Sequence, residues 1–125
     1  TTALCIKACN RLGIPVLVLD RPNPINGVTV EGPGLLEEFT SFVGLHPVPV
    51  RHAMTIGEIA TMVAERHYRG ANVSVIECEG WDRNLYLDQT TAPWGMPSPN
   101  MPTIDTAVVY PGGCLFEATN LSEGR

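Results

Sequence analysis

The sequence has few charged residues of either sign and no segment in which basic residues gather. Of its 125 residues, 17% are charged, the formal net charge is −5, and the Lys and Arg residues are scattered. These features argue against a nucleic-acid partner, because no basic face is available to a phosphate backbone. No apolar run approaches the roughly 20 residues that a membrane-spanning helix requires, so no membrane span is predicted.

Several short motifs of metal and cofactor chemistry are also missing. The four cysteines form no CxxC pair, the histidines have no paired-ligand spacing, and HExxH does not occur, so no metal site is predicted. Neither a GxGxxG phosphate loop nor a GxSxG elbow is present. We therefore expect no nucleotide cofactor. Cys5 and Cys9, four positions apart on one helical face, are expected to be buried packing thiols.

What the sequence does contain is enough apolar residues for a core, 44% of the chain. The length suits one domain. The chain begins without methionine inside a predicted helix and stops in a polar segment. We therefore expect residues 1–125 to be a single partial domain, the later portion of a larger one.

The order of the predicted elements indicates an α/β fold. Apolar residues at helical spacing predict a helix over 2–12 that Gly13 ends. The uninterrupted apolar run at 15–19 predicts a strand buried on both faces of a parallel sheet. Residues 55–58 form a capping box that opens a second helix with an apolar stripe at Ile56, Ile59, Ala60 and Val63.

A second strand is predicted at 73–78, where β-branched residues cluster. Alternating helices and strands of this kind predict part of a Rossmann-like three-layer domain with a mainly parallel sheet and long functional loops. Residues 81–102 are expected to be irregular, with Trp81 and Trp94 either stacking on a sugar or packing the loop. Thr103 is expected to cap a helix over 104–110, and Pro111 to begin another.

Polar residues that suit a functional site occur in the loop after the first strand and in two later segments of the chain. Open α/β sheets present ligands at the carboxyl ends of their strands, and a loop of more than thirty residues is typically functional. Carboxylates act as acid, base or nucleophile in glycoside hydrolysis, while amides and guanidinium groups bind hydroxyls and carboxylates. The candidates are Asp20, Arg21, Asn23 and Glu31; Arg51 and His52; and Asn100, Asn120, Glu123 and Arg125.

Each candidate also has a structural alternative. Asp20 and Arg21 equally suit an internal ion pair that shapes the loop. Arg51 and His52 equally suit an ordinary surface turn. Glu58 is expected to cap its helix and not to take part in catalysis.

Seven motifs in order resemble the exo-β-N-acetylmuramidases of bacterial cell-wall recycling and cover nearly the whole chain. They are Leu-Asp-Arg-Pro-Asn-Pro-Ile (19–25), Val-Glu-Gly-Pro (30–33), Ser-Phe-Val-Gly (41–44), Val-Pro-Val-Arg-His-Ala-Met-Thr-Ile-Gly-Glu (48–58), Ser-Pro-Asn-Met-Pro-Thr (98–103), Tyr-Pro-Gly (110–112) and Thr-Asn-Leu-Ser-Glu-Gly-Arg (119–125). The chain departs from the family at Ala53, where we expect glycine. The family has a Rossmann-like amino-terminal domain and a smaller carboxy-terminal one, so this chain would be the later part of the first.

The resemblance implies hydrolysis of terminal, non-reducing N-acetylmuramic acid from peptidoglycan-derived saccharides such as MurNAc-GlcNAc, without a cofactor. Glu31 and Glu123 are the expected catalytic carboxylates, because each lies in a glycine-flanked loop and neither has a helix to cap. A structural role for each is equally open, as is an essential carboxylate upstream of Thr1. The lactyl carboxylate of the sugar suits a bidentate arginine, Arg51 or Arg125. An extracytoplasmic location, secreted or periplasmic, is expected by the same resemblance.

Two other functions remain compatible with the residues. One is a non-catalytic cell-wall sugar-binding domain of the same fold, with Trp81 or Trp94 stacking on the sugar. The other is a nucleotide-binding Rossmann domain, which would require a phosphate loop upstream of residue 1.

Overall fold

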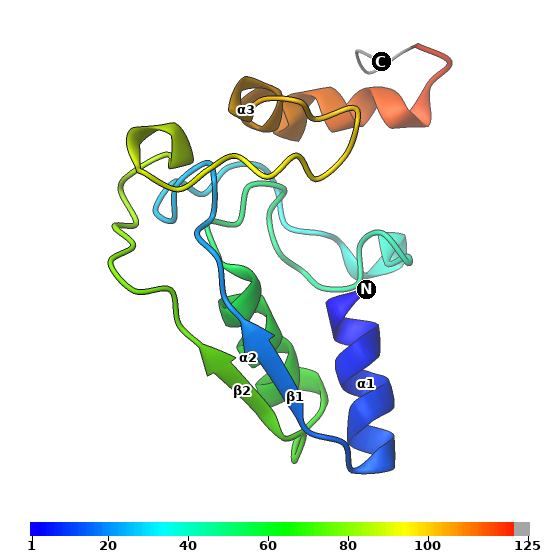
Figure 1. Ribbon diagram of the computed structural model, residues 1–125. Helices are drawn as coiled ribbons and strands as arrows, with labels where there is room; N and C mark the ends of the chain where they lie inside the picture. The colour runs from blue at the N-terminus through cyan, green and yellow to red at the C-terminus, as the bar shows by residue number, and fades with distance from the viewer. Residues whose placement is uncertain (122–125) are drawn as a thin grey trace. The chain divides into compact units, whose positions relative to one another are not determined.

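A computed structural model describes residues 1–121, and the chain forms two compact units (Figure 1). We call Thr1–Asn23 together with Met54–Arg83 the sheet unit, and Pro24–Ala53 together with the described residues from Asn84 onward the loop unit. The predictions for Glu123 and Arg125 lie outside the described residues.

The sheet unit is a strand–helix–strand repeat preceded by a helix (Figure 1). Strands β1 (Val16–Leu19) and β2 (Val73–Ile76) are parallel, with Val16 opposite Val73 and Leu19 opposite Ile76. Helix α2 (Ile56–His67) lies between them in sequence and contacts both strands, and α1 (Thr2–Leu12) contacts α2. The prediction of an α/β fold with a parallel sheet and flanking helices is confirmed. β2 ends two residues earlier than expected.

Helix α1 has the predicted bounds, but the predicted buried face is wrong. Gly13 ends the helix in the left-handed conformation, as expected. The buried residues of α1 are Ala3 and Ile6, whereas Cys5 is exposed and Leu12 is 73% exposed. The prediction that Cys5 is a buried packing thiol is therefore also wrong. The physical reason is that α1 packs on α2 through the Ile6 side of the helix.

Helix α2 buries Ala60 and Val63 of the predicted stripe, and Ile59 is half-buried. Ala60 and Val63 are fully buried, and Ala64 and Gly57 are buried beside them. Ile56 is an exception, since it lies in the first turn and is 39% exposed. Val63 and Ile6 are the largest fully buried side chains of the described residues, so the centre of this small core lies between α2 and α1.

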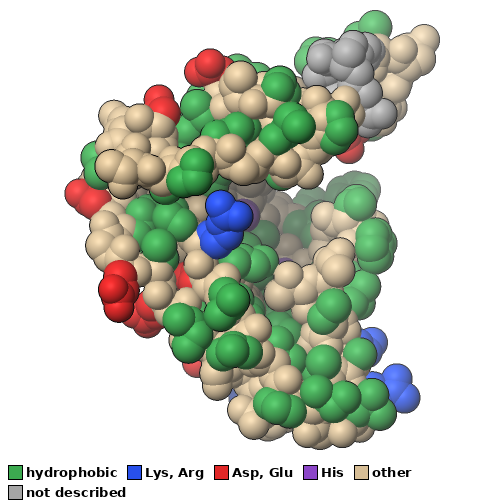
Figure 2. All heavy atoms as spheres, viewed as in Figure 1, with side chains coloured by type: hydrophobic (Ala, Val, Ile, Leu, Met, Phe, Trp, Pro, Cys, Tyr) green, Lys and Arg blue, Asp and Glu red, His purple; other side chains and the backbone are tan. Residues whose placement is uncertain are grey.

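The two strands are covered on one face only. Alternate residues of each strand are half-buried, and the intervening Leu17, Leu19 and Ile76 are 62%, 69% and 55% exposed. Figure 2 shows hydrophobic side chains gathered over this part of the unit. The expectation that 15–19 is buried on both faces is thus wrong for this chain, because the described residues supply helices to one side alone.

The loop unit has little regular structure before its last helix. Short 3₁₀ helices occur at Glu37–Phe39 (η1) and Leu87–Gln89 (η2), and isolated antiparallel bridges join Glu31 to Arg51 and Ser41 to Gly44. Residues 81–102 are otherwise irregular, as predicted.

Helix α3 (Ile104–Gly113) begins after Thr103, as predicted, but the Thr103 side chain makes no capping hydrogen bond and Pro111 does not begin a new helix. Pro111 lies inside α3, which continues to Gly113 and is followed by the 3₁₀ helix η3 (Cys114–Ala118). A proline near a helix end removes only one backbone hydrogen bond, and α3 tolerates it in its last turn. Within the described part of the chain, no helix is long and apolar enough to cross a membrane.

Two of the described residues other than glycine adopt positive φ, and both are buried. Asn26 has φ of 68°, and its side-chain oxygen accepts hydrogen bonds from the backbone N–H groups of Val28 and Thr29. Ala53 has φ of 57°. Glycine favours this left-handed region, so the departure from the family pattern at Ala53 falls where glycine has a conformational advantage.

Candidate functional site

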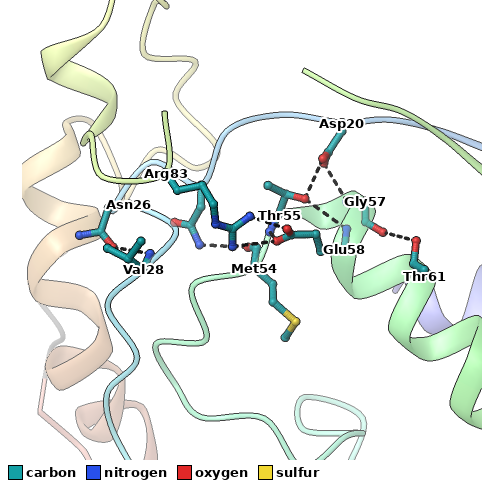
Figure 3. Close-up of polar contacts among 10 residues, drawn as sticks. Asp20, Asn26, Val28, Met54, Thr55, Gly57, Glu58, Thr61 and Arg83 are labelled. Atoms are coloured by element: carbon teal, nitrogen blue, oxygen red, sulfur yellow. Dashed lines mark hydrogen bonds and ion pairs between the residues drawn. The ribbon is translucent and has the colours of Figure 1, made fainter. Parts of the chain in front are cut away.

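Asp20, directly after β1, caps the N-terminus of α2 (Figure 3). One carboxylate oxygen accepts from Thr55 Oγ1 at 2.7 Å, and the other accepts from the backbone N–H of Gly57 at 2.8 Å. Anionic groups are favoured here because unpaired N–H groups and the helix dipole both attract negative charge. Among the described residues, no ion pair joins Asp20 to Arg21, so the alternative of an internal Asp20–Arg21 pair is not formed.

The contact between Asp20 and the helix depends on the absence of a side chain at Gly57. A Cβ atom at this position would lie 2.6 Å from Val75 Cγ1 and 2.8 Å from Asp20 Cγ. Real Cβ atoms do not approach other atoms so closely, so any larger residue would displace the strand or the carboxylate. Gly57 therefore allows the end of β1 to approach the first turn of α2.

The capping box predicted at 55–58 is present. Thr55 Oγ1 accepts from the backbone N–H of Glu58, and the Glu58 carboxylate accepts from the backbone N–H of Thr55 at 2.9 Å. Glu58 also pairs with Arg83 at 2.5 Å. Burial would raise the pKa of Glu58, but its bonds to Arg83 and Thr55 outweigh burial and hold that pKa below its ordinary value. The prediction that Glu58 is a capping residue is confirmed.

These groups line a polar hollow of about 630 Å³ in the sheet unit. The hollow lies at the carboxyl ends of the strands, where α/β sheets present ligands. Trp81 lines it, with the Arg83 guanidinium over the indole ring at 5.0 Å. The N–H groups of Gly57 and Glu58 in the first turn of α2 are already bonded by Asp20 and Thr55, so the helix does not offer these two groups to a phosphate.

In the loop unit, the structure brings Glu31 and Arg51 together. Their backbones form a reciprocal antiparallel pair, with N–H to carbonyl distances of 3.0 and 3.1 Å. The Arg51 guanidinium also donates to the Glu31 carboxylate at 2.7 Å. The Arg51 side chain is 12% exposed and that of Glu31 is 62% exposed. Arg51 therefore does not lie in an ordinary surface turn, and the Glu31 carboxylate remains open to solvent.

Two further groups bind the same guanidinium. Arg51 Nη2 donates to the carbonyl oxygen of Ile25 at 2.6 Å and to the hydroxyl of Tyr86 at 2.7 Å. Burial would lower the pKa of Arg51, but the hydrogen bonds with Glu31 and Tyr86 outweigh it and raise that pKa above its ordinary value. Arg51 thus stays charged and links three separate parts of the loop unit.

The other predicted site residues have less defined surroundings. Arg21 is exposed, and Asn23 is held by donating to the carbonyl of Met54 at 3.0 Å. His52 is half-buried, and burial lowers its pKa. Asn100 and Asn120 are exposed, and neither side chain hydrogen-bonds another described residue.

Sequence reasoning missed two residues of these arrangements. Tyr86 lies in a segment that was predicted only to be irregular, and nothing in its sequence surroundings pairs it with Arg51. Gly57 had a visible signal, because glycine in the first turn of a well-capped helix lowers helix propensity and indicates a close approach. In the described part of the chain, no group of three or more His, Cys, Asp or Glu residues is placed to hold a metal ion.

Comparisons with known proteins point to one family. Residues 1–105 match the family described as exo-beta-N-acetylmuramidase NamZ, N-terminal. The whole chain is 46% identical to the peptidoglycan beta-N-acetylmuramidase NamZ of Bacillus subtilis, of which it covers 30%.

Two crystal structures of DUF1343 family proteins from Bacteroides fragilis are similar in structure as well as sequence. The first has a TM-score of 0.84 and 30% identity over 91% of this chain. The second has a TM-score of 0.80 and 38% identity over 94% of this chain. The chain spans about a third of the length of each of these relatives, 30% of the first and 33% of the second.

Proposed function

Because this chain belongs to the exo-β-N-acetylmuramidase NamZ family, we propose that the full-length protein is a glycoside hydrolase of peptidoglycan fragments. It would release terminal, non-reducing N-acetylmuramic acid from saccharides such as MurNAc-GlcNAc. Carboxylate acid/base catalysis would perform the hydrolysis, and such a mechanism needs no cofactor. The observation that carries the proposal is the 46% identity, over all 125 residues, to a protein named as a peptidoglycan beta-N-acetylmuramidase.

Within this chain, Glu31 is the described carboxylate that best suits a catalytic role. It is open to solvent, it lies in the long loop after β1, and the largely enclosed Arg51 side chain fixes one of its oxygens. Asp20 and Glu58 suit such a role less well, because both are engaged in capping α2. The proposal keeps Glu123 as a second candidate from the family resemblance. It also keeps an extracytoplasmic location, where peptidoglycan is found.

The test is release of free N-acetylmuramic acid from MurNAc-GlcNAc by the full-length protein and its Glu31→Gln and Glu123→Gln variants. Glutamine keeps the size of the side chain but can neither donate a proton nor act as a base. A catalytic glutamate should therefore lose turnover by orders of magnitude while disaccharide binding, followed by calorimetry, survives. Glu38→Gln is the matched control, since Glu38 is exposed in η1 of the same unit.

The outcomes separate the possible roles. Release that collapses in one glutamine variant and persists in Glu38→Gln supports the glycosidase and identifies a working carboxylate. Release that survives both glutamine changes places the catalytic carboxylates elsewhere in the protein. Disaccharide binding without any release by the parent overturns the hydrolase and leaves a sugar-binding domain.

A further inference from the structure

The guanidinium of Arg51 is bonded on both terminal nitrogens by groups of the protein itself. Nη1 donates to the Glu31 carboxylate, and Nη2 donates to the Ile25 carbonyl and the Tyr86 hydroxyl. Only 12% of the side chain is exposed. A bidentate grip on a substrate carboxylate needs two parallel N–H groups of one arginine, and Arg51 has already committed those groups.

Tyr86 is fixed from two directions. Its hydroxyl oxygen accepts from Arg51, and its ring lies beneath the same guanidinium at 5.7 Å from the ring centroid. The next residue, Leu87, donates its backbone N–H to the carbonyl of Pro24 at 3.0 Å. A tyrosine hydroxyl has one proton to donate. Because the Arg51 N–H points at the phenol oxygen, the phenol proton must be directed away from the guanidinium.

Glu31 is arranged in a complementary way. Its Oε2 atom accepts from Arg51, while Oε1 has no hydrogen-bond partner among the described residues and the side chain is 62% exposed. One arginine therefore holds a carboxylate with one unbonded oxygen atom and a hydroxyl whose proton points away from the guanidinium. The Glu31 Oε2 atom and the Tyr86 hydroxyl oxygen each lie 2.7 Å from a terminal nitrogen of the same guanidinium, so the two side chains are neighbours. A sugar, whose oxygen atoms are spaced over a few ångströms, can meet both.

We infer that Arg51 is a positioning residue, and that Tyr86 donates a hydrogen bond to an oxygen of the saccharide that Glu31 acts upon. This inference rests on the proposed function and deepens it. It replaces the sequence-based expectation that Arg51 itself grips the lactyl carboxylate. A charged, half-enclosed donor–acceptor pair held by one rigid group is suited to catalysis because the geometry is set before substrate arrives.

The test compares Tyr86→Phe and Arg51→Lys in the full-length protein with Tyr68→Phe and Arg11→Lys as matched controls. Tyr68 lies at the end of α2 and Arg11 on the exposed surface of α1, both outside the loop unit. Tyr86→Phe removes the hydrogen bond donated to the saccharide and also the bond that the hydroxyl accepts from Arg51. Because Arg51 keeps its bonds to Glu31 and Ile25, kcat/KM for MurNAc-GlcNAc should fall about tenfold to a hundredfold. Thermal unfolding of each variant shows whether the fold is retained.

Arg51→Lys distinguishes positioning from substrate gripping. Lysine keeps the charge but cannot bond Glu31, Ile25 and Tyr86 in a planar fork. If Arg51 is a positioning residue, Arg51→Lys should lower kcat and leave KM nearly unchanged. The kcat of Arg51→Lys should then fall by the same factor for MurNAc-GlcNAc and for its lactyl methyl ester. If the parent does not cleave the ester, the kcat and KM values on the free acid make the distinction.

Different results overturn different claims. A folded Tyr86→Phe variant with the kcat/KM of Tyr68→Phe overturns the donor role. An Arg51→Lys variant that raises KM only for the free acid overturns positioning and returns Arg51 to carboxylate binding. In both cases the parent still releases N-acetylmuramic acid, so the proposed function stands. A folded parent that releases none overturns the proposed function together with the inference.

Discussion

Replacing Gly57 by alanine should destabilise the protein, although alanine is the better helix former. The added Cβ would lie 2.6 Å from Val75 Cγ1 and 2.9 Å from Asp20 Oδ2. Relief of this overlap costs about 1–3 kcal/mol. Moving the carboxylate also weakens its bond to the Gly57 N–H, and hydrogen bonds to charged groups contribute about 1.5–3 kcal/mol.

The opposing gain in helix propensity is about 1 kcal/mol, so Gly57→Ala should lower the free energy of unfolding by about 2–4 kcal/mol. Urea denaturation of the full-length protein, followed by far-ultraviolet circular dichroism, measures this change. Gly112→Ala is the matched control because Gly112 lies in α3 with nothing within 4 Å of an added Cβ. It should stabilise or leave stability unchanged.

A double-mutant cycle adds a sharper test of the same reasoning. In Asp20→Ala the carboxylate is absent, so part of the overlap with the new Cβ disappears. The loss caused by Gly57→Ala should then be smaller in the Asp20→Ala background than in the parent. A Gly57→Ala variant as stable as Gly112→Ala would refute the close approach of β1 to α2.

Three further substitutions test other features. Asp20→Asn should lower the free energy of unfolding by about 1–2 kcal/mol, because the helix terminus loses its charge and Thr55 loses an acceptor. The KM for the disaccharide should stay constant. A raised KM with unchanged stability would instead indicate that Asp20 binds the substrate. Ala53 has φ of 57°, so Ala53→Gly relieves backbone strain but loses a methyl group and adds chain entropy to the unfolded state, and its free energy of unfolding should stay within about 1 kcal/mol of the parent. Ala53→Val should lower that free energy by at least about 2 kcal/mol, measured by thermal unfolding. Burial lowers the pKa of His52 below 6.5, so the unfolded chain binds a proton that the folded chain does not, and stability falls as pH drops below that value. His52→Gln should therefore flatten the decline of Tm between about pH 7 and about pH 5. An unchanged slope would contradict this reasoning.

Local signals in the sequence predicted the helices and strands well. The capping box at 55–58 and the left-handed Gly13 each depend on a few neighbouring residues, and both occur as predicted. The buried face of α1 was not predictable in this way, because cysteine and leucine at helical spacing do not reveal which side meets α2. Pro111 was misinterpreted because the same residue fits the start of a helix and the last turn of another.

The candidate sites show a similar division. Asp20, Glu31 and Arg51 were predicted from their loop positions and residue types, but their partners were not. The Glu31–Arg51 pair joins residues 20 positions apart, and Arg51 meets Tyr86 across 35 positions. Such contacts arise from the path of an irregular loop, and neither periodicity nor local turn chemistry encodes that path.

The backbone bridge between Glu31 and Arg51 closes the intervening chain into a loop with a fixed neck. Main-chain hydrogen bonds in both directions and a side-chain ion pair hold the neck. Insertions or deletions between these residues would change the loop at a low entropic cost, about 0.6 kcal/mol for each doubling of length. A change in the length of this loop should therefore leave the geometry of Glu31 and Arg51 unchanged, because the neck is held independently of the residues between them.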